Sequence, residues 1–513
     1  MSSIELGSAI VDALIGTEVR DVVLAPGSRS AALALAVERA AREAKLNLHV
    51  RIDERVAGYT ALGIAKERGR PVAVVTTSGT AVANLAPAAM EARAAAVPLI
   101  FFTADRPAHF VGSGANQTTD QLGAFGPSAL GVIRLSSESG DAAAWASGVH
   151  RAVALAGGWL TRQPGPVQVN VEFAAPLVGE LPAPEERPLL VCGPSDEDGT
   201  IYEVDDLDLT VVLVGDASPE LGAEARMMAE EAGAPLLAEP SSNAREGVCA
   251  IAAYRELLDT LGGEIQRVVV FGHPTLSRPV SRLLARDDID ILHVTHGAQW
   301  VDPGHRATLV GHDIRIPEQE EHWLERWRLA DVRRAPGPQQ FVADAVLAHL
   351  SADDDLVLGS SSIIRAADLS PISADPPRVF ANRGVSGIDG TVATATGIAL
   401  AGRRPTTVLL GDLTLQHDLG ALVRPSLEEW PELRIIVADD DGGSIFHGLE
   451  QGAPEYAASF ERVFGTPQGL DLVAVARALG WHPVRVSDEA ALADALGSEA
   501  DFIVVSVPRG RSD

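Results

Sequence analysis

Two acidic turns lie in the C-terminal third of this 513-residue chain, each directly after a short apolar run. Thr406–Leu410 leads into Gly411 and Asp412, and Leu433–Val437 leads into three consecutive aspartates at 439–441. A helical crossover, expected at 413–427, would bring the two strand ends to one edge of a parallel sheet, where open α/β sheets bind ligands. A few carboxylates beside glycines suit Mg²⁺ shared with a diphosphate better than an all-protein metal cage.

The same stretch resembles the thiamine diphosphate (ThDP) motif, in which Gly-Asp-Gly is followed further along the chain by Asn-Asn. In that motif the Asp, the second Asn and a carbonyl beyond it bind the metal, which implies Asp412, Asp440 and Gly442 here. Leu413 replaces the second glycine, and Asp440 replaces the asparagine. A register with Asp439 as the ligand would put Asp441 at the carbonyl position. A βαβ unit whose acidic turns are merely solvated is the alternative.

Polar groups also follow several expected strands in the first third of the chain. Hydroxyls, carboxamides, two guanidiniums and one carboxylate recur there, in Ser28, Arg29, Glu54, Ser78, Arg106, Asn116 and Gln117. Arginines and carboxamides gathered on one sheet edge would suit a polyanionic small molecule. Taken singly, each has an ordinary explanation, because serines cap helices, acids favour helix N-termini and arginines form surface ion pairs.

Alternating apolar runs and helix-period segments predict the elements that position these groups. The first third should contain strands at 22–24, 48–52, 72–75, 98–102 and 167–171, with helices at 4–15, 31–44, 56–66, 82–94 and 142–156. Similar alternation continues to the C-terminus, which indicates mainly parallel sheets covered by helices. Proline-rich passages at 176–198 and 334–338 read as linkers. We therefore predict three α/β domains, over residues 1–178, 199–334 and 339–513.

Composition limits the classes of partner. The net charge of −29 and pI near 4.8 argue against a nucleic-acid groove or an anionic membrane surface. Two cysteines, Cys192 and Cys249, far apart in the chain, fit a reducing cytosol without disulfides. No apolar run approaches the length of a membrane span, and the N-terminus lacks a signal-peptide pattern. We expect a cytoplasmic protein that binds neither nucleic acid nor membrane.

Several longer motifs resemble one family, the 2-succinyl-5-enolpyruvyl-6-hydroxy-3-cyclohexene-1-carboxylate (SEPHCHC) synthases of menaquinone biosynthesis. They are PGSRS at 26–30, DER at 53–55, TSGTAVAN at 77–84, TADRP at 103–107, ANQT at 115–118, NRGVSGIDG at 382–390, GDLTLQHD at 411–418 and GGSIF at 442–446. They span both outer thirds in family order, and this family reads Gly-Asp-Leu where other ThDP enzymes have a second glycine.

The resemblance implies a ThDP-dependent transferase that decarboxylates 2-oxoglutarate and adds the resulting succinyl-semialdehyde carbanion equivalent to isochorismate. By family position, Glu54 would hydrogen-bond the pyrimidine N1′ and promote the imino tautomer. Cofactor contacts are implied for Ser78, Gly79, Ser386, Gly387, Ile388, Gly411, Asp412, Leu413, Ile445 and Phe446. Substrate contacts are implied for Ser28, Arg29, Arg106, Asn116, Gln117, Ser361, Arg365 and Arg383. Asp412, Asp440 and the Gly442 carbonyl would bind Mg²⁺ or Mn²⁺.

ThDP enzymes place the first domain of one subunit against the last domain of its partner, so the resemblance also implies a homodimer or a dimer of dimers. Two other interpretations stay open. One is a ThDP carboligase or decarboxylase of the acetolactate-synthase type, which would not need Arg29, Arg106, Asn116 and Gln117 together. The other is a non-catalytic ThDP-binding regulator, which would not need Glu54.

Overall fold

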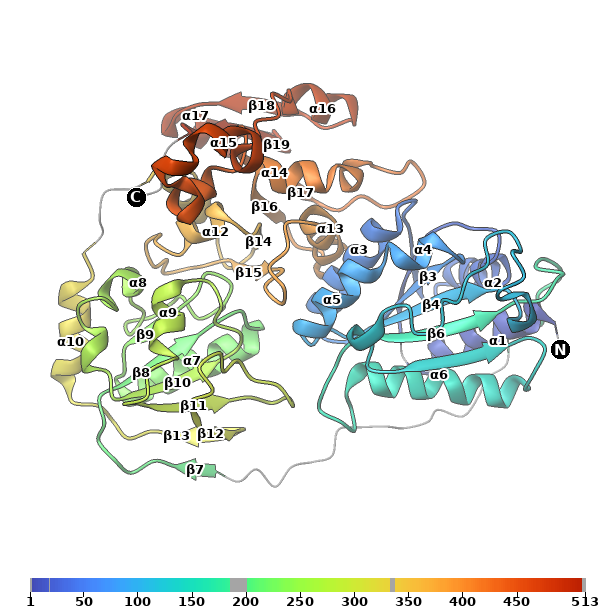
Figure 1. The fold of residues 1–513 in the computed structure, drawn as a ribbon, viewed down its shortest axis with the longest axis horizontal. Coiled ribbons are helices and arrows are strands. Elements are labelled where there is room, and N and C mark those ends of the chain that lie inside the picture. Colours follow the sequence, from blue (N-terminus) through green and yellow to red (C-terminus); the bar gives the residue numbers. More distant parts are fainter. Residues whose placement is uncertain (1, 18, 185–200, 333–336, 510–513) are drawn as a thin grey trace. The chain divides into compact units, whose positions relative to one another are not determined.

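The computed structural model describes residues 2–17, 19–184, 201–332 and 337–509, which contain three main sheets covered by helices (Figure 1). The chain forms two compact units. The first takes its described residues from 1–196, 384–403 and 418–431, and the second takes them from 197–383, 404–417 and 432–513. All pairings between named strands are parallel, which confirms the predicted α/β class.

The first unit is built on a six-stranded sheet of order β2-β1-β3-β4-β6-β5. Its strands are β1 Asp21–Leu24, β2 Asn47–Val50, β3 Val72–Thr76, β4 Leu99–Asp105, β5 Val132–Ser136 and β6 Val167–Glu172. Its helices are α1 Ser3–Gly16, α2 Ala31–Arg42, α3 Glu54–Arg68, α4 Thr80–Ala83, α5 Ala86–Ala94, α6 Ala142–Gly157 and α13 Thr391–Gly402. Every residue of β1, β3, β4 and β6 is buried, as expected for parallel strands covered on both faces.

Helices α3 and α13 pack closely within this unit. A Cβ at Gly63 of α3 would come within 1.9 Å of the Thr394 carbonyl oxygen, and one at Gly397 of α13 within 2.1 Å of the Thr60 carbonyl oxygen. Only glycine therefore lets the two helix backbones approach this closely. Asp53 caps the N-terminus of α3, because its carboxylate accepts the N–H groups of residues 55 and 56.

The second unit begins with a five-stranded sheet of order β12-β11-β10-β8-β9 and the pair β13-β7. The strands are β7 Ile201–Glu203, β8 Thr210–Val214, β9 Leu236–Ala238, β10 Arg267–Phe271, β11 Asp290–Val294, β12 Ala307–Gly311 and β13 Asp313–Arg315. The helices are α7 Pro219–Ala232, α8 Tyr254–Leu257, α9 Arg278–Leu283 and α10 Glu321–Ala330. Trp323 and Trp327 of α10 are fully buried and meet edge to face, 5.8 Å between ring centroids.

The last sheet, also in the second unit, has the order β15-β14-β16-β17-β19-β18. Its strands are β14 Asp355–Leu358, β15 Arg378–Ala381, β16 Thr406–Gly411, β17 Leu433–Asp439, β18 Pro483–Val486 and β19 Phe502–Ser506. Its helices are α11 Gln340–His349, α12 Ser362–Ala367, α14 Asp412–His417, α15 Ala457–Phe460, α16 Leu472–Ala478 and α17 Glu489–Leu496. Parallel pairing of β16 with β17 confirms that the two acidic turns share a sheet edge.

Two predicted helices were wrong in extent. The expected helix 82–94 is split into α4 and α5, because Pro87 near the start of α5 cannot continue the preceding turn. The expected crossover helix 413–427 ends at His417. Beyond it Asp418 turns inward, where its carboxylate accepts the Ala393 N–H at 2.9 Å.

Parts of both predicted linkers, 185–198 and 334–336, lie outside the described residues, as does Cys192; the three domain boundaries stay a prediction. Cys249 is buried and free. Within the described ranges, no helix has the length and apolar character needed to cross a bilayer.

Candidate active site

The turn after β1 is held against the turn after β3 in the first unit. A Cβ at Gly27 would come within 2.2 Å of the Thr77 side chain, so this close approach requires glycine. The Arg29 N–H donates to Thr77 Oγ1 at 3.3 Å, and the Arg29 guanidinium donates to the Phe173 carbonyl oxygen, also at 3.3 Å. Ser28 is exposed on the same turn.

The 115–121 loop closes over the turn after β3. Ser78 Oγ donates to the Gln117 carbonyl oxygen at 2.8 Å, and Gln117 Nε2 donates to Thr77 Oγ1 and to the Ser78 carbonyl oxygen, both at 3.2 Å. The Gly79 N–H donates to Gln121 Oε1 at 3.1 Å. Arg106 Nε donates to the Asn116 carbonyl oxygen at 3.1 Å. Five predicted site residues, at 78, 79, 106, 116 and 117, are therefore joined in one network.

Arg29 and Arg106 are close enough to influence each other electrostatically. Burial, followed by repulsion from the Arg106 guanidinium, lowers the pKa of Arg29. In the part of the chain that the structure describes, neither arginine lies at ion-pair distance from a carboxylate. Two cations without a carboxylate at ion-pair distance, although the Asp105 charge acts on Arg29, favour an anionic ligand at this edge.

Glu54 is the first residue of α3. Its Oε2 accepts a hydrogen bond from Asn84 Nδ2 at 3.2 Å, and Asn84 directly follows α4. The structure thus joins Glu54 to the end of the TSGTAVAN motif rather than to the arginines. One carboxylate oxygen is engaged by a neutral amide, and no cation is paired with this group in the contacts described.

The segment 384–390 leads into α13 and contains Ser386, Gly387 and Ile388, all partly exposed. Ser386 has φ of 60°, in the left-handed region. At the end of the segment, a Cβ at Gly390 would come within 2.1 Å of the Tyr59 ring. The Tyr59 hydroxyl donates to the Asp389 carboxylate at 2.8 Å. The segment is therefore fixed on α3, the helix that begins with Glu54.

Asp412, Asp440 and Gly442 come together in the second unit. Asp412 is 3% exposed, and its Oδ2 is buried without a hydrogen-bond partner. Burial, then the negative charges of Asp440 and Asp439, raise the pKa of the Asp412 carboxyl to about 7, although the N–H groups of Leu413 and Gly442 donate to it. A buried carboxylate beside like charges is stabilised by a cation.

The neighbouring aspartates differ in their contacts. Asp440 accepts hydrogen bonds from Ser444 Oγ and from Gln339 Nε2, the latter at 2.8 Å, and burial raises its pKa. Asp439 is paired with Arg485 at 2.8 Å. Asp441, with φ of 53°, is exposed and accepts the N–H groups of Gln468 and Gly469. Only Asp412 and Asp440 of this set are both buried and without a cation at ion-pair distance.

Gly442 forms a tight main-chain approach. Its φ is 141°, and a Cβ there would come within 2.1 Å of the Gly465 carbonyl oxygen. No group of three or more His, Cys, Asp or Glu side chains is placed to hold a metal among the described residues. Two carboxylates and a main-chain carbonyl would instead leave half of an octahedral Mg²⁺ shell to a ligand and water, which fits a metal shared with a diphosphate.

The other predicted residues of the second unit lie around these turns. Gly411 ends β16, Leu413 follows Asp412 in α14, and both are half-buried. Ile445 and Phe446 lie in the short turn Ser444–Gly448, and the Phe446 and Phe464 ring centroids are 5.7 Å apart. They supply the apolar part of this edge.

Arg365 and Arg383 form a second cationic pair, after β14 and β15. Burial, followed by the Arg383 charge, lowers the pKa of Arg365. Arg365 donates to the Ser361 carbonyl oxygen at 2.7 Å, and Ser361 has φ of 85°. Arg383, which is 4% exposed, donates to Thr275 Oγ1 at 3.1 Å.

Sequence reasoning missed the buried groups that support these turns. Gln121, Gln168 and Asn170 hydrogen-bond one another and Asp105, from the 115–123 loop to β4 and β6. Asp418 and Glu91 are buried carboxylates that accept main-chain N–H groups. The only available signal was a charged or amide residue inside an otherwise apolar element.

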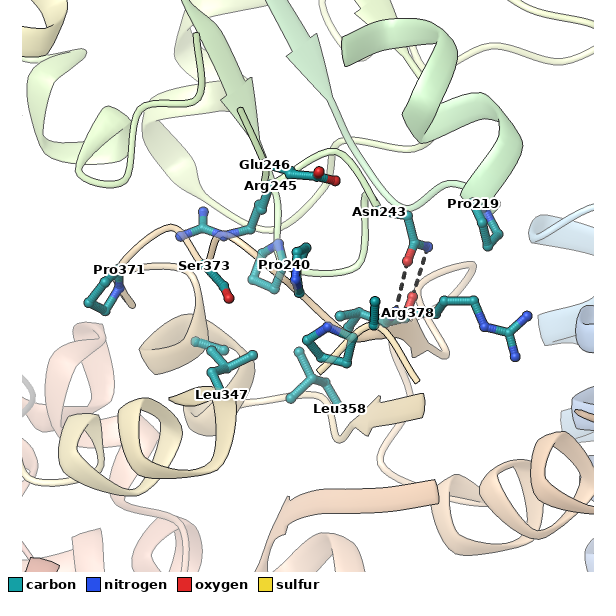
Figure 2. Close-up of a pocket in the computed structure, with 15 residues that line it drawn as sticks. Pro219, Pro240, Asn243, Arg245, Glu246, Leu347, Leu358, Pro371, Ser373 and Arg378 are labelled. Atoms are coloured by element: carbon teal, nitrogen blue, oxygen red, sulfur yellow. Dashed lines mark hydrogen bonds between the residues drawn. The ribbon is translucent and has the colours of Figure 1, made fainter. Parts of the chain in front are cut away.

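A separate cavity of about 170 Å³ lies in the second unit, and none of the predicted site residues lines it (Figure 2). Asn243 makes the paired hydrogen bonds drawn there to the main chain of Val379, at 3.0 and 2.7 Å. Its two arginines are already engaged, Arg378 by Asp355 at 2.8 Å and Arg245 by the Ser370 carbonyl oxygen at 2.8 Å. Prolines and aliphatic side chains supply most of the remaining wall.

The regions that match known proteins contain both groups of predicted site residues. Residues 4–124 match the N-terminal TPP binding domain of thiamine pyrophosphate enzymes, and residues 359–505 match their C-terminal TPP binding domain. The chain is 44% identical to the SEPHCHC synthase of Kineococcus radiotolerans, over 99% of this chain and 94% of that protein. It is 41% identical to the synthase of Leifsonia xyli subsp. xyli (98% and 96%) and 44% identical to that of a Nocardioides species (97% and 93%).

Proposed function

Because the chain belongs to the SEPHCHC synthase family, we propose that it decarboxylates 2-oxoglutarate and joins the four-carbon unit to isochorismate, releasing CO₂. The product is the compound in the family's name, an intermediate of menaquinone biosynthesis. The protein is a ThDP-dependent transferase. ThDP, when bound, supplies the electron sink that makes the decarboxylated carbon nucleophilic. The residues of this chain would bind and orient the cofactor and the substrates, and they would exclude water from the site.

The proximity of Arg29 to Arg106 is the observation that best supports these substrates. Isochorismate has two carboxylates, and 2-oxoglutarate keeps one remote from the reacting carbon. Two guanidiniums without carboxylate partners in the described structure would bind such anions, with Asn116, Gln117 and Ser28 beside them. Arg365, Arg383 and Ser361 are the second set proposed for substrate carboxylates.

The turns that carry Asp412 and Asp440, here called the acidic edge, would fit a divalent cation. Asp412 and Asp440 would hold Mg²⁺ or Mn²⁺ together with the Gly442 carbonyl, since Asp412 Oδ2 is buried and unpartnered and the pKa of Asp412 is raised by burial and then by like charge. Asp440 suits this role better than Asp439, whose carboxylate is paired with Arg485. Gly411, Leu413, Ile445 and Phe446 would contact the cofactor beside the metal.

Glu54 would hydrogen-bond N1′ of the aminopyrimidine and hold a proton there. Asn84 Nδ2 orients its carboxylate at 3.2 Å. Ser78, Gly79, Ser386, Gly387 and Ile388 are the further residues proposed for the cofactor. We propose that Glu54 of one subunit serves a cofactor held by Asp412 of the other, in a cytoplasmic homodimer or dimer of dimers.

Anaerobic incubation with ThDP, Mg²⁺, 2-oxoglutarate and isochorismate, followed by mass analysis, tests the reaction. We expect the SEPHCHC product and one CO₂ for each isochorismate consumed. An acetolactate-type product, or CO₂ release that leaves isochorismate unchanged, would contradict the assignment. A protein that binds ThDP but releases no CO₂ would instead be the non-catalytic regulator.

A further inference from the structure

Glu91, on α5 in the first unit, is a buried carboxylate that the proposed reaction does not use. It is 2% exposed. Its Oε1 accepts the Gly384 N–H at 2.8 Å, and its Oε2 accepts the Val385 N–H at 2.7 Å. These two N–H groups are neighbours in the chain, and the two oxygens of one carboxylate engage them together. They open the segment 384–390.

Packing fixes the same point independently of the charge. A Cβ at Gly384 would come within 2.9 Å of the Ala95 nitrogen and of the Glu91 carbonyl oxygen, and within 3.0 Å of the Ala94 Cβ. Two of these neighbours are main-chain atoms at the end of α5, which cannot move aside cheaply. The backbone at Gly384 therefore lies directly on the helix that carries Glu91.

The other end of the segment is fixed by α3. Gly390 lies against the Tyr59 ring, and the Tyr59 hydroxyl donates to Asp389 at 2.8 Å. Between the two anchored ends lie the proposed cofactor residues at 386–388. A displacement at Gly384 would therefore be transmitted to these residues.

A carboxylate suits this position better than a neutral side chain. It offers acceptors only, so both N–H groups are satisfied by charge-assisted hydrogen bonds. An amide would present a donor to one of them and leave a buried N–H unpaired. The glutamate thus specifies where residues 384 and 385 lie and does more than fill space.

We infer that Glu91 is a positioning residue that sets the segment 384–390 for the reaction; this rests on the proposed function. It touches neither cofactor nor substrate. Removing the paired hydrogen bonds from Glu91 to residues 384 and 385, here called the clamp, should displace residues 386–388 by about 1 Å, and misplacement on that scale costs roughly 10²-fold in rate.

The test compares Glu91→Gln with Asp21→Asn in the full-length protein. Asp21 is the control, because it is a buried carboxylate of the same unit whose partners are Asn47 and His49 on β2 and Arg68 at 3.8 Å, all away from the segment 384–390. We expect Glu91→Gln to lower kcat roughly 10²-fold at saturating ThDP, while the ThDP Kd changes only a few-fold. The Tm should fall by about as much in both variants, with kcat preserved in the control.

A second variant, Gly384→Ala, leaves Glu91 intact but forces the backbone off α5, so it should reproduce the loss in kcat. Amide hydrogen exchange of the cofactor-free proteins gives a readout without catalysis. Exchange at residues 384–390 should quicken in both variants and stay unchanged in Asp21→Asn. If Glu91→Gln does not fold, Gly384→Ala decides.

Retention of kcat within a few-fold in Gly384→Ala, or in a folded Glu91→Gln, would overturn the inference, as would unchanged exchange at 384–390. Failure of the proposed function is recognised separately, because the wild-type protein would then form no SEPHCHC product. In that case the C2–H exchange rate of bound ThDP replaces kcat, since it needs no substrate. A rate equal to wild type in both variants would contradict the clamp.

Discussion

The first and last sheets have the same strand order but carry different side chains at corresponding strand ends. Counted from the first strand of each sheet, both orders read 2-1-3-4-6-5. The third and fourth strands of the first sheet lead to Ser78 and Arg106, and those of the last sheet lead to Asp412 and Asp440. The same frame therefore presents a hydroxyl and a cation in one sheet, proposed to face the cofactor and substrate carboxylates, and two acids in the other, proposed to hold a metal. The turn residues, rather than the topology, decide which ligand group each edge can hold.

Changing Glu54, the proposed hydrogen-bond partner of the pyrimidine N1′, should have the largest effect. Glu54→Gln keeps the size and the contact with Asn84 but cannot share a proton, so C2–H exchange of bound ThDP should slow by roughly 10²-fold or more. ThDP affinity should change far less, because the acidic edge is proposed to hold the diphosphate. Nuclear magnetic resonance of quenched samples measures the exchange. The control is Glu38→Gln, an exposed acid on α2. Exchange preserved within a few-fold would count against the role of Glu54.

Neutralising the cationic edge, which is formed by Arg29 and Arg106, should have the next largest effect. Arg29→Ala or Arg106→Ala removes a charged hydrogen-bond donor, which is expected to raise the KM for isochorismate roughly 10- to 100-fold. Decarboxylation of 2-oxoglutarate without acceptor should persist. Arg42→Ala, which removes an exposed arginine paired with Glu38, should change neither. If only the decarboxylation half-reaction suffers, the assignment of isochorismate to Arg29 and Arg106 is wrong.

The role of the acidic edge is tested by Asp440→Asn, which restores the residue usual in the ThDP motif. Loss of one negative charge should weaken Mg²⁺ binding by roughly tenfold. It should also strengthen ThDP binding, because repulsion of the diphosphate falls. Metal titration at fixed ThDP measures both. Asp441→Asn is the matched control, since this exposed neighbour binds main-chain N–H groups instead. Unchanged apparent affinities in Asp440→Asn would remove this explanation.

A buried acid that is not among the proposed site residues, although the charge of Arg383 acts on it, should give the smallest effect. Burial raises the pKa of Glu239 to about 8 from 4.5. Between these pH values the unfolded chain has lost this proton while the folded chain keeps it, so the free energy of unfolding falls as pH rises. Glu239→Gln should therefore gain stability relative to wild type from pH 5 to pH 8.

Denaturant titrations over this pH range measure that difference. Glu231→Gln, an exposed change on α7, should follow the wild-type curve. The Glu239 effect should also be independent of Mg²⁺ and ThDP, unlike the changes at the acidic edge. A pH dependence in Glu239→Gln equal to that of wild type would show that this group does not titrate as inferred.

Sequence alone could predict the strand ends because buried parallel strands are continuous apolar runs, and the turn residues that follow them are polar by necessity. That reasoning placed Asp412 beside Asp440 and gathered Arg106, Asn116 and Gln117 on one edge. It could not find Glu91 or Asp418, because their partners are main-chain N–H groups of residues distant in sequence, Gly384 and Ala393, which carry no side-chain signal. The same inward turn of Asp418 ends the crossover helix early.

The central proposal is that Glu54 of one subunit and the acidic edge of its partner build one active site. A purified heterodimer of a Glu54→Gln chain and an Asp412→Asn chain, isolated through two different tags, tests it most directly. One of its two sites would then have both residues intact, so it should show roughly half the activity of the wild-type dimer, although each variant homodimer is inactive. A heterodimer as inactive as its parents would contradict the account.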